Sequence, residues 1–446
     1  MAIQLSDHFN YKKLFLYTIP SIMTMILTSI YSIVDGLFVS NYVGKTPFAA
    51  LNLIYPFIMA ISTVGFMMGT GGSAIVGIAL GEGKKKKANE YFSMIIYVTA
   101  IVSIVISIIA MIFMKDIAYF LGASEQMIHD CVLYGRIIAG GLTAFILQVV
   151  FQSFCITAQK PSLNFKLSIT SGLTNIVLDY LFVAVFQWGI AGAAFATIIG
   201  QTVGAVFPLI YFYRENDSLL QLTKTNFEGR VLLKVCINGS SELMTNISAS
   251  LVNILYNFQL MSLAGENGVA AYGVIMYVSF IFSAVYIGYS IGSAPIFSYH
   301  FGAKNDGELK NLVKKSLLII GTVGLFMTTL AEIMAPFLVR IFVGYDQDLF
   351  KMTCYGFQLY SFSFLVMGFN IWSSGFFTAL GDGVTSAILA FLRTLVFQVI
   401  VIYTLPYLLG IDGIWLAVVV AEVMALFVTI YFLLSKKNHF LVGSIE

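Results

Sequence analysis

Twelve long apolar runs constrain this chain more than any other feature. An α-helix needs about 20 apolar residues to cross the hydrocarbon core of a bilayer, and nothing alternates in the ten-residue pattern of barrel strands. We therefore predict an all-α integral membrane protein with twelve transmembrane helices. The predicted spans are residues 14–39, 47–78, 91–114, 127–157, 163–186, 190–213, 232–262, 269–298, 314–338, 350–379, 384–409 and 413–434.

Composition excludes the other broad classes. Of the 446 residues, 59% are hydrophobic and 10% are charged, whereas a soluble domain carries about 25% charged residues. The net charge of only +2 argues against a nucleic-acid partner. No two cysteines have CxxC spacing, so we interpret them as small buried hydrophobes: Cys131, Cys155, Cys236 and Cys354.

Basic residues in the loops predict the orientation. With a cytoplasmic N-terminus, 18 Lys and Arg lie on the cytoplasmic side and 4 on the other, leaving Arg136 and Arg393 inside helices. The positive-inside rule then places both termini of this multi-pass cell-membrane protein in the cytoplasm. The lysine run at 84–87 is interpreted as a solvated loop that anchors a helix end, with lipid headgroup contact as the alternative.

The chain also repeats itself. When the chain is shifted against itself so that residues 188–196 fall on 409–417, Gly189 pairs with Gly410, and the same shift places Thr157 on Thr378. Six helices per half is an even number, so both halves have the same orientation in the membrane. We predict two pseudo-symmetric six-helix bundles.

The predicted organisation follows from this repeat. The N-lobe is residues 1–213, the cytoplasmic linker is residues 214–230, and the C-lobe is residues 231–446. Two parallel lobes with a cavity between them are typical of an alternating-access transporter. Since one chain holds both lobes, we expect a monomer surrounded by membrane lipid.

Three charged residues of the N-lobe, Asp35, Arg136 and Asp179, fall inside predicted spans at similar depth. An ionisable group in the membrane usually faces a cavity or a partner. The three form either a structural ion-pair network or, because one negative charge is in excess, a cation or proton site.

The C-lobe carries Glu242, Glu332, Arg393 and Glu422 inside its spans. Glu332 lies near the outer end and is expected to reach water. For Glu242 and Glu422 the sequence leaves structural pairing and a role toward solute equally open, and Arg393 is expected to pair or to extend to the interface.

Several motifs resemble the multidrug and toxic compound extrusion (MATE) transporters. They are "NIVLDYLF" at 175–182, "WGIAGAAFAT" at 188–197, the glycine-rich ends of helices 2 and 8, and the "TAQKPS" and "TALGDG" loops at 157–162 and 378–383. Together they cover nearly the whole chain and look most like the bacterial DinF/MepA-type branch.

The resemblance implies a V-shaped pair of bundles that exports cationic or amphiphilic drugs in exchange for H⁺ or Na⁺, with no other cofactor. It implies a bend of helix 1 at Pro20 and a bound Na⁺, if any, at Asp35 and Asp179. The cation or proton site that it implies consists of Asp35, Gln152, Asn175, Asp179 and Thr197. Asn175 and Asp179 are one helical turn apart and share a face.

The chain also departs from that pattern. Relatives of the NorM type place acidic residues in helices 7 and 10 of the C-lobe, where this chain has Asn246 and Met367. Glu242 stands instead in an unusual "NGSSEL" run. The residues that we expect at the substrate cavity are Tyr31, Arg136 and Glu242.

Two other functions fit parts of this description. A flippase for a lipid-linked or polysaccharide precursor would need a broad cationic cavity, and the N-lobe charges are in anionic excess. A membrane enzyme would need clustered metal ligands, but the four histidines are far apart and near helix ends or tails. We therefore predict a cation-coupled exporter and no enzymatic activity.

Overall fold

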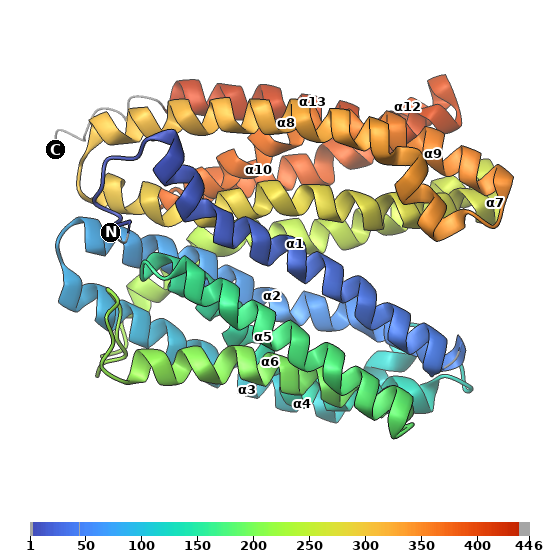
Figure 1. Cartoon of the computed structure of the whole chain (residues 1–446), viewed down its shortest axis with the longest axis horizontal. Helices are drawn as coiled ribbons and strands as arrows, with labels where there is room; N and C mark the ends of the chain where they lie inside the picture. The colour runs from blue at the N-terminus through green and yellow to red at the C-terminus, as the bar shows by residue number, and fades with distance from the viewer. Residues whose placement is uncertain (1–2, 44, 437–446) are drawn as a thin grey trace.

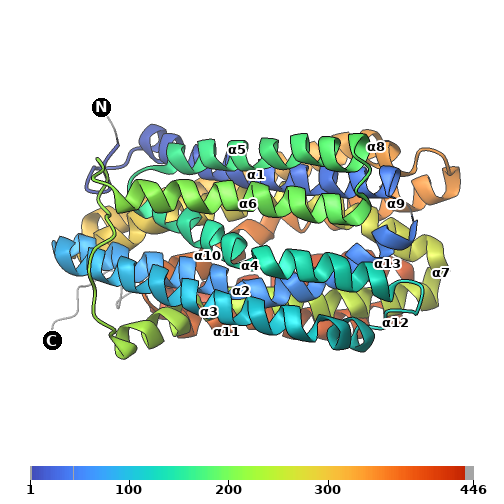
Figure 2. The ribbon, with the colours of Figure 1, turned by 90° about the horizontal axis from the view of Figure 1, so that it is seen from below.

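The structure, a computed structural model, describes residues 3–43 and 45–436; the side chains of residues 32–41, 45 and 48 lie outside the description. Apart from two short π-helical segments, its helices are α-helical and run roughly parallel to one long axis (Figures 1 and 2). The elements are α1 (Tyr11–Tyr42), α2 (Lys45–Gly81), α3 (Lys85–Phe120), α4 (Ile128–Thr157), α5 (Pro161–Asp179), the π-helix η1 (Tyr180–Val185), α6 (Gly189–Tyr213), α7 (Gly229–Gly302), α8 (Asp306–Val343), α9 (Gln347–Ser361), α10 (Phe364–Ala379), α11 (Gly383–Phe391), the π-helix η2 (Leu392–Val396), α12 (Phe397–Leu409) and α13 (Ile411–Ser435).

Within the described residues, ten helices are long and apolar enough to cross a membrane, or eleven if α9 and α10, bent by 53°, form one span. One of the ten, α7, has 74 residues, far more than one crossing requires. Gly265 breaks it with a left-handed φ of 63°, and beyond the break Tyr272 stacks on Tyr256 with ring centroids 4.7 Å apart. Because α7 folds back on itself, it supplies two of the twelve predicted spans.

The internal repeat is visible in the backbone turns. Gly189 and Gly410, which the repeat pairs, both have a positive φ where α6 and α13 begin, of 62° and 59°. The same shift pairs Gly83 with Lys304, and these two also share a positive φ, in the turns after α2 and α7. At Lys304 this conformation is uncommon for a residue with a side chain. Positions that the repeat pairs therefore have the same backbone turn, which confirms two pseudo-symmetric bundles.

Among the residues with described side chains, hydrophobic cores connect the bundles on one side only. We call the side that holds the start of α1 and the end of α13 the terminal side (Figure 1). Away from it, one core contains buried residues of α2 to α6 alone and another contains residues of α7 to α13 alone. On the terminal side, one core joins Phe9 and Tyr17 of the first bundle to Phe297 and Trp372 of the second. Another core contains residues of α2, α3, α4 and α6 together with Val235 of α7.

Glycine permits the closest contact between the bundles. A Cβ on Gly71 of α2 would lie 2.2 Å from the carbonyl oxygen of Val235 in α7, and a Cβ on Gly239 would lie 2.0 Å from that of Met67. At Gly81 the nearest atom is the carbonyl oxygen of Tyr299, again at 2.0 Å. Both arms of α7 therefore pack backbone to backbone on α2 at the terminal side.

The segment before α1 adds a second connection there. Phe9 is completely buried, its backbone N–H donates to Oε1 of Glu308 in α8 at 2.8 Å, and its carbonyl accepts from Asn311 at 3.1 Å. The first helix of the first bundle is thus anchored to the second bundle.

Candidate functional site

A polar face runs along α5 inside the first bundle. Ser171, Asn175 and Asp179 recur at every fourth position, so they lie on one face of the helix, and all three are buried. Gly200 of α6 lacks a side chain, and a Cβ there would lie only about 3 Å from the Asn175 Cβ, so α6 packs closely on this face. Asp179, at 0% exposure, is the last residue of α5 before η1. A buried carboxylate among apolar helices is costly unless the site stabilises its charge or neutralises it.

One amide of α4 contacts this polar face. Nε2 of Gln148 donates to Oγ of Ser171 at 3.2 Å, and Ser171 donates to the carbonyl of Gly200 at 2.7 Å. Gly204 leaves the room that the Gln148 side chain occupies. Gln152, the amide that the resemblance implies, lies one turn further along α4 and is half-buried. Sequence reasoning missed Gln148, and a glutamine one turn from Gln152 was the only signal for it.

Helix α1 faces α5 near the same residues. The Tyr31 ring lies about 3.3 Å from the position that a Cβ on Gly172 would occupy, so Tyr31 packs against α5 one turn before Asn175. The side chain of Asp35 lies outside the described residues. Pro20 is inside α1, which continues through it, and its carbonyl accepts the Thr24 hydroxyl at 2.8 Å.

Arg136 does not join the acidic residues. It is exposed on α4, and its Nε donates to the carbonyl of Met111 in α3 at 3.2 Å, whereas Asp179 is fully buried in α5. The expectation of one cluster of Asp35, Arg136 and Asp179 is therefore corrected for the arginine. Arg136 lines neither cavity described below.

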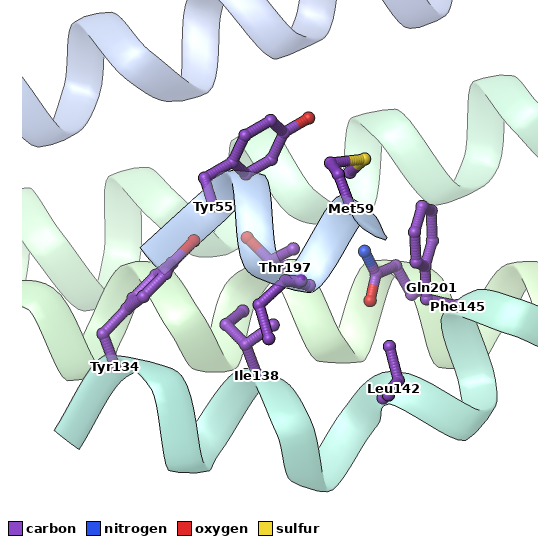
Figure 3. Close-up of a pocket in the computed structure, with 9 residues that line it drawn as sticks. Tyr55, Met59, Tyr134, Ile138, Leu142, Phe145, Thr197 and Gln201 are labelled. Atoms are coloured by element: carbon purple, nitrogen blue, oxygen red, sulfur yellow. The ribbon is translucent and has the colours of Figure 1, made fainter. Parts of the chain in front are cut away.

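A small cavity of about 30 Å³ lies within the first bundle between α2, α4 and α6. Thr197 and Gln201 of α6 line it opposite Tyr55 and Met59 of α2 (Figure 3). Tyr134 contributes from α4. The cavity thus includes one predicted residue, Thr197, and a glutamine and two tyrosines that sequence reasoning did not select.

In the second bundle the buried charges are paired. Glu422 of α13, 3% exposed, accepts from Nε of Arg393 in η2 at 2.8 Å and from Nδ2 of Asn370 in α10 at 2.7 Å. Asn370 in turn accepts the Thr429 hydroxyl at 2.9 Å. Structural pairing, one of the two alternatives for Glu422, is what the structure contains.

Glu242 lies elsewhere, in a cavity between the bundles. This cavity, about 40 Å³, is bordered by the terminal half of α2, by α4, by both arms of α7 and by α10. Its lining residues are Thr70, Ser73, Ala74, Ser153, Glu242, Ser290, Ile291, Ala294, Pro295, Gly375, Thr378 and Ala379.

The two positions that carry acids in the NorM-type pattern do not form a site here. Asn246 donates to the carbonyl of Glu242 within its own helix at 2.8 Å, and Met367 is a buried core residue. Among the residues with described side chains, no three His, Cys, Asp or Glu converge as a metal site would require.

Two membrane-spanning bundles of one repeat, joined at one side and holding polar residues inside their helices, define a membrane transporter. The chain belongs to the MatE family, whose model matches residues 20–181 and again 243–404. The two matches have the same length, and each covers most of one bundle. Members of this family are transporters and not enzymes.

Individual relatives agree with this assignment. The chain is 22% identical to the multidrug export protein MepA of Staphylococcus haemolyticus (strain JCSC1435), over 96% of this chain and 94% of MepA. It is 23% identical to MepA of Staphylococcus aureus (strain MRSA252), over 92% and 91%. Among solved structures, an outward-facing multidrug resistance MATE family transporter of the MOP superfamily matches with a TM-score of 0.92 at 21% identity, covering 98% of both chains.

Proposed function

We propose that this protein is a secondary active exporter of small cationic or amphiphilic organic solutes, driven by influx of H⁺ or Na⁺. Membership of the MatE family and the curated name of the MepA relatives, multidrug export protein, support the solute class. The proposal places the protein in the cell membrane as a monomer, with the terminal side in the cytoplasm.

The observation that carries the coupling assignment is the burial of Asp179 on the polar face of α5. A carboxylate without exposure gains a large stabilisation from binding a proton or a cation, worth several kcal/mol in a membrane interior. Asn175, one turn away, has no partner for its Nδ2 in the described residues, so its amide remains available to a ligand or a water. Asp35, Gln152 and Thr197 remain part of the proposed site.

Alternating access is the proposed mechanism. The bundles have separate cores away from the terminal side and shared cores on it, so a rocking motion has to break only the shared ones. About 5.5 kcal/mol of differential binding moves a two-state equilibrium from 1:99 to 99:1, and neutralising one buried charge is of that order. Bending of α1 at Pro20 is the proposed local response.

The lining of the cavities disfavours the flippase alternative. A pyrophosphate headgroup requires several cationic groups, and the residues that line the two described cavities include no Lys or Arg. The cavity between the bundles carries a carboxylate instead, which would repel an anionic headgroup.

The test is transport in reconstituted vesicles with imposed pH or Na⁺ gradients, using ethidium as the organic cation. The parent protein should drive ethidium uphill with one of the two gradients. Asp179→Asn should abolish gradient-driven movement while the protein stays folded. Glu332→Gln, which alters a C-lobe carboxylate that accepts from Ser361 at 2.7 Å, is the matched control and should retain transport.

Two results would overturn the proposal. Well-folded Asp179→Asn protein that exports at the parent rate would remove the coupling role. Parent vesicles that move no organic cation under either gradient, but translocate an anionic lipid-linked sugar, would favour the flippase.

A further inference from the structure

Glu242 is a membrane-embedded carboxylate without a partner. Its side chain makes no hydrogen bond or ion pair within the part of the chain that the structure describes, although it is only half-buried. The buried acids of the second bundle, Glu308 and Glu422, both have partners. The cavity at Glu242 has room for two or three water molecules, which reduces the cost of the charge without neutralising it.

The hydroxyl groups around Glu242 present acceptors to this cavity. Thr70 donates its hydroxyl hydrogen to the carbonyl of Phe66 at 2.9 Å, and Ser73 donates to the carbonyl of Thr70 at 3.0 Å. The Thr378 hydroxyl donates to Ser386 Oγ at 2.7 Å. Because a hydroxyl has one hydrogen and two lone pairs, these three offer oxygen lone pairs toward the cavity. Lone pairs beside a carboxylate favour a bound cation, and oxygen ligands suit a hard one.

Among the residues whose side chains the structure describes, no other charge borders this cavity. Glu242 is the only ionisable residue among those that line the cavity. Of the helices packed around it, α10 and α11 contain no ionisable residue, and α4 carries His129, Asp130 and Arg136 in the half remote from Ser153. The thiol of Cys155, near Ser153, is completely buried and does not line the cavity. On α2 the charged residue is Lys45, at the opposite end of the helix.

The charged residues of α7 itself also lie away from the cavity. On the first arm, Lys234 is exposed, and Arg230 lies still nearer the start of the helix. Glu266 follows the break at Gly265, and His300 is buried near the far end of the second arm. None of these four side chains is among those that line the cavity.

The cavity is assembled from both bundles at the edge of their contact. Thr70 precedes Gly71, and Glu242 lies one turn after Gly239, the two glycines that bring α2 and α7 together. Separating the bundles at the terminal side would move Thr70, Ser73 and Ser153 away from Glu242 and Thr378. A ligand that needs both sets of oxygens therefore binds only the closed arrangement and stabilises it.

We propose that Glu242, with the hydroxyls of Thr70, Ser73 and Thr378, binds one small monovalent cation, H⁺ or Na⁺, and that the bound cation holds the terminal side closed. The site is distinct from the one on α5. The inference rests on the proposed movement of the two bundles but not on the identity of the exported solute.

The test measures closure directly by double electron–electron resonance in nanodiscs. Spin labels replace Lys86 of α3 and Lys310 of α8, exposed residues at the terminal ends of the two bundles, after substitution of the four native cysteines. The ratio of short to long distances is followed in a pH series in choline chloride, and in a NaCl series at fixed high pH. A response to pH alone assigns the proton, and a response to NaCl at fixed pH assigns Na⁺.

In the parent, saturation with the cation should raise the closed-to-open ratio at least fivefold. Because the α5 site also responds to the cation, the Glu242 variants are compared in the Asp179→Asn background. There Glu242→Gln should remove the remaining dependence, Glu242→Asp should retain part of it, and Glu332→Gln should leave it unchanged. Full dependence in Glu242→Gln, or no dependence on either cation in the parent, would overturn the proposal. Because Asp179→Asn should abolish export yet keep this response, failure of the proposed function and failure of this site give different results.

Discussion

Gln148 and Gln152 lie one turn apart on α4, and Gln148 is the amide that contacts the polar face of α5. Gln148→Ala removes a hydrogen bond worth about 1 kcal/mol and leaves a void beside Gly204. We expect export to fall by about fivefold or more, with a smaller effect for Gln152→Ala, measured as initial ethidium efflux from vesicles. A larger loss in Gln152→Ala would mean that Gln152, and not Gln148, is the amide on which the coupling site depends.

Asp382 provides a pH-dependent contact outside the membrane spans. Burial alone would raise its pKa, but hydrogen bonds from Lys436 and Thr385 outweigh this and lower the pKa of Asp382 below its ordinary value. A lowered folded-state pKa stabilises the fold above the unfolded-state pKa of about 3.9, and that contribution is lost as the pH falls through the folded-state value.

The thermal midpoint of the parent should therefore fall more steeply below pH 4 than that of Asp382→Asn, while at pH 7 the variant should be the less stable of the two. Differential scanning fluorimetry in detergent from pH 7 to pH 3 measures both. Parallel curves for the two proteins would contradict a contribution from this ion pair.

At the scale of elements, apolarity predicted every span because the bilayer imposes length and hydrophobicity directly on the sequence. The interruptions inside spans could not be predicted in this way. The bend between α9 and α10 and the π-helical turns η1 and η2 depend on packing between helices, which apolar composition does not encode. The same reason limits what could be predicted of the candidate site. Asp179 and Asn175 are recognisable from their spacing, but the outward position of Arg136 depends on the rotation of α4 about its axis.

The contact of α2 with α7 gives a prediction for a single methyl group. In Gly239→Ala the new Cβ would lie 2.0 Å from the carbonyl oxygen of Met67, so the backbones must separate. Gly273→Ala, on the second arm of α7 with nothing within 4 Å, is the matched control. We expect Gly239→Ala to destabilise the closed arrangement by about 1–3 kcal/mol, as overpacking usually does.

Hydrogen exchange measured by mass spectrometry checks this expectation, since opening exposes the backbone amides of residues 67–81. Those amides should exchange faster in Gly239→Ala and at the parent rate in Gly273→Ala. Equal rates in all three proteins would mean that this contact does not hold the terminal side closed.

At the scale of the whole molecule, the repeat could be read from the sequence because paired turns need the same backbone conformation. Gly189 and Gly410 both adopt a positive φ, and the shift that pairs them also pairs Gly83 with Lys304, which adopt a positive φ as well. Which faces of the two bundles meet could not be predicted, because the contact is made by backbone at glycines and not by a recognisable set of side chains.

The orientation in the membrane gives the last prediction. Lys86 and Lys115 are exposed residues near opposite ends of α3, about 29 residues or 44 Å apart along the helix, so the membrane must separate them. The excess of basic residues on the terminal side predicts that Lys86 faces the cytoplasm. In a cysteine-free background, Lys115→Cys should react with an impermeant maleimide on intact cells, whereas Lys86→Cys and Asp217→Cys, in the connection after α6, should react only after permeabilisation. Labelling of Lys86→Cys on intact cells would reverse the orientation, and with it the direction in which the proposed cation site at Glu242 opens.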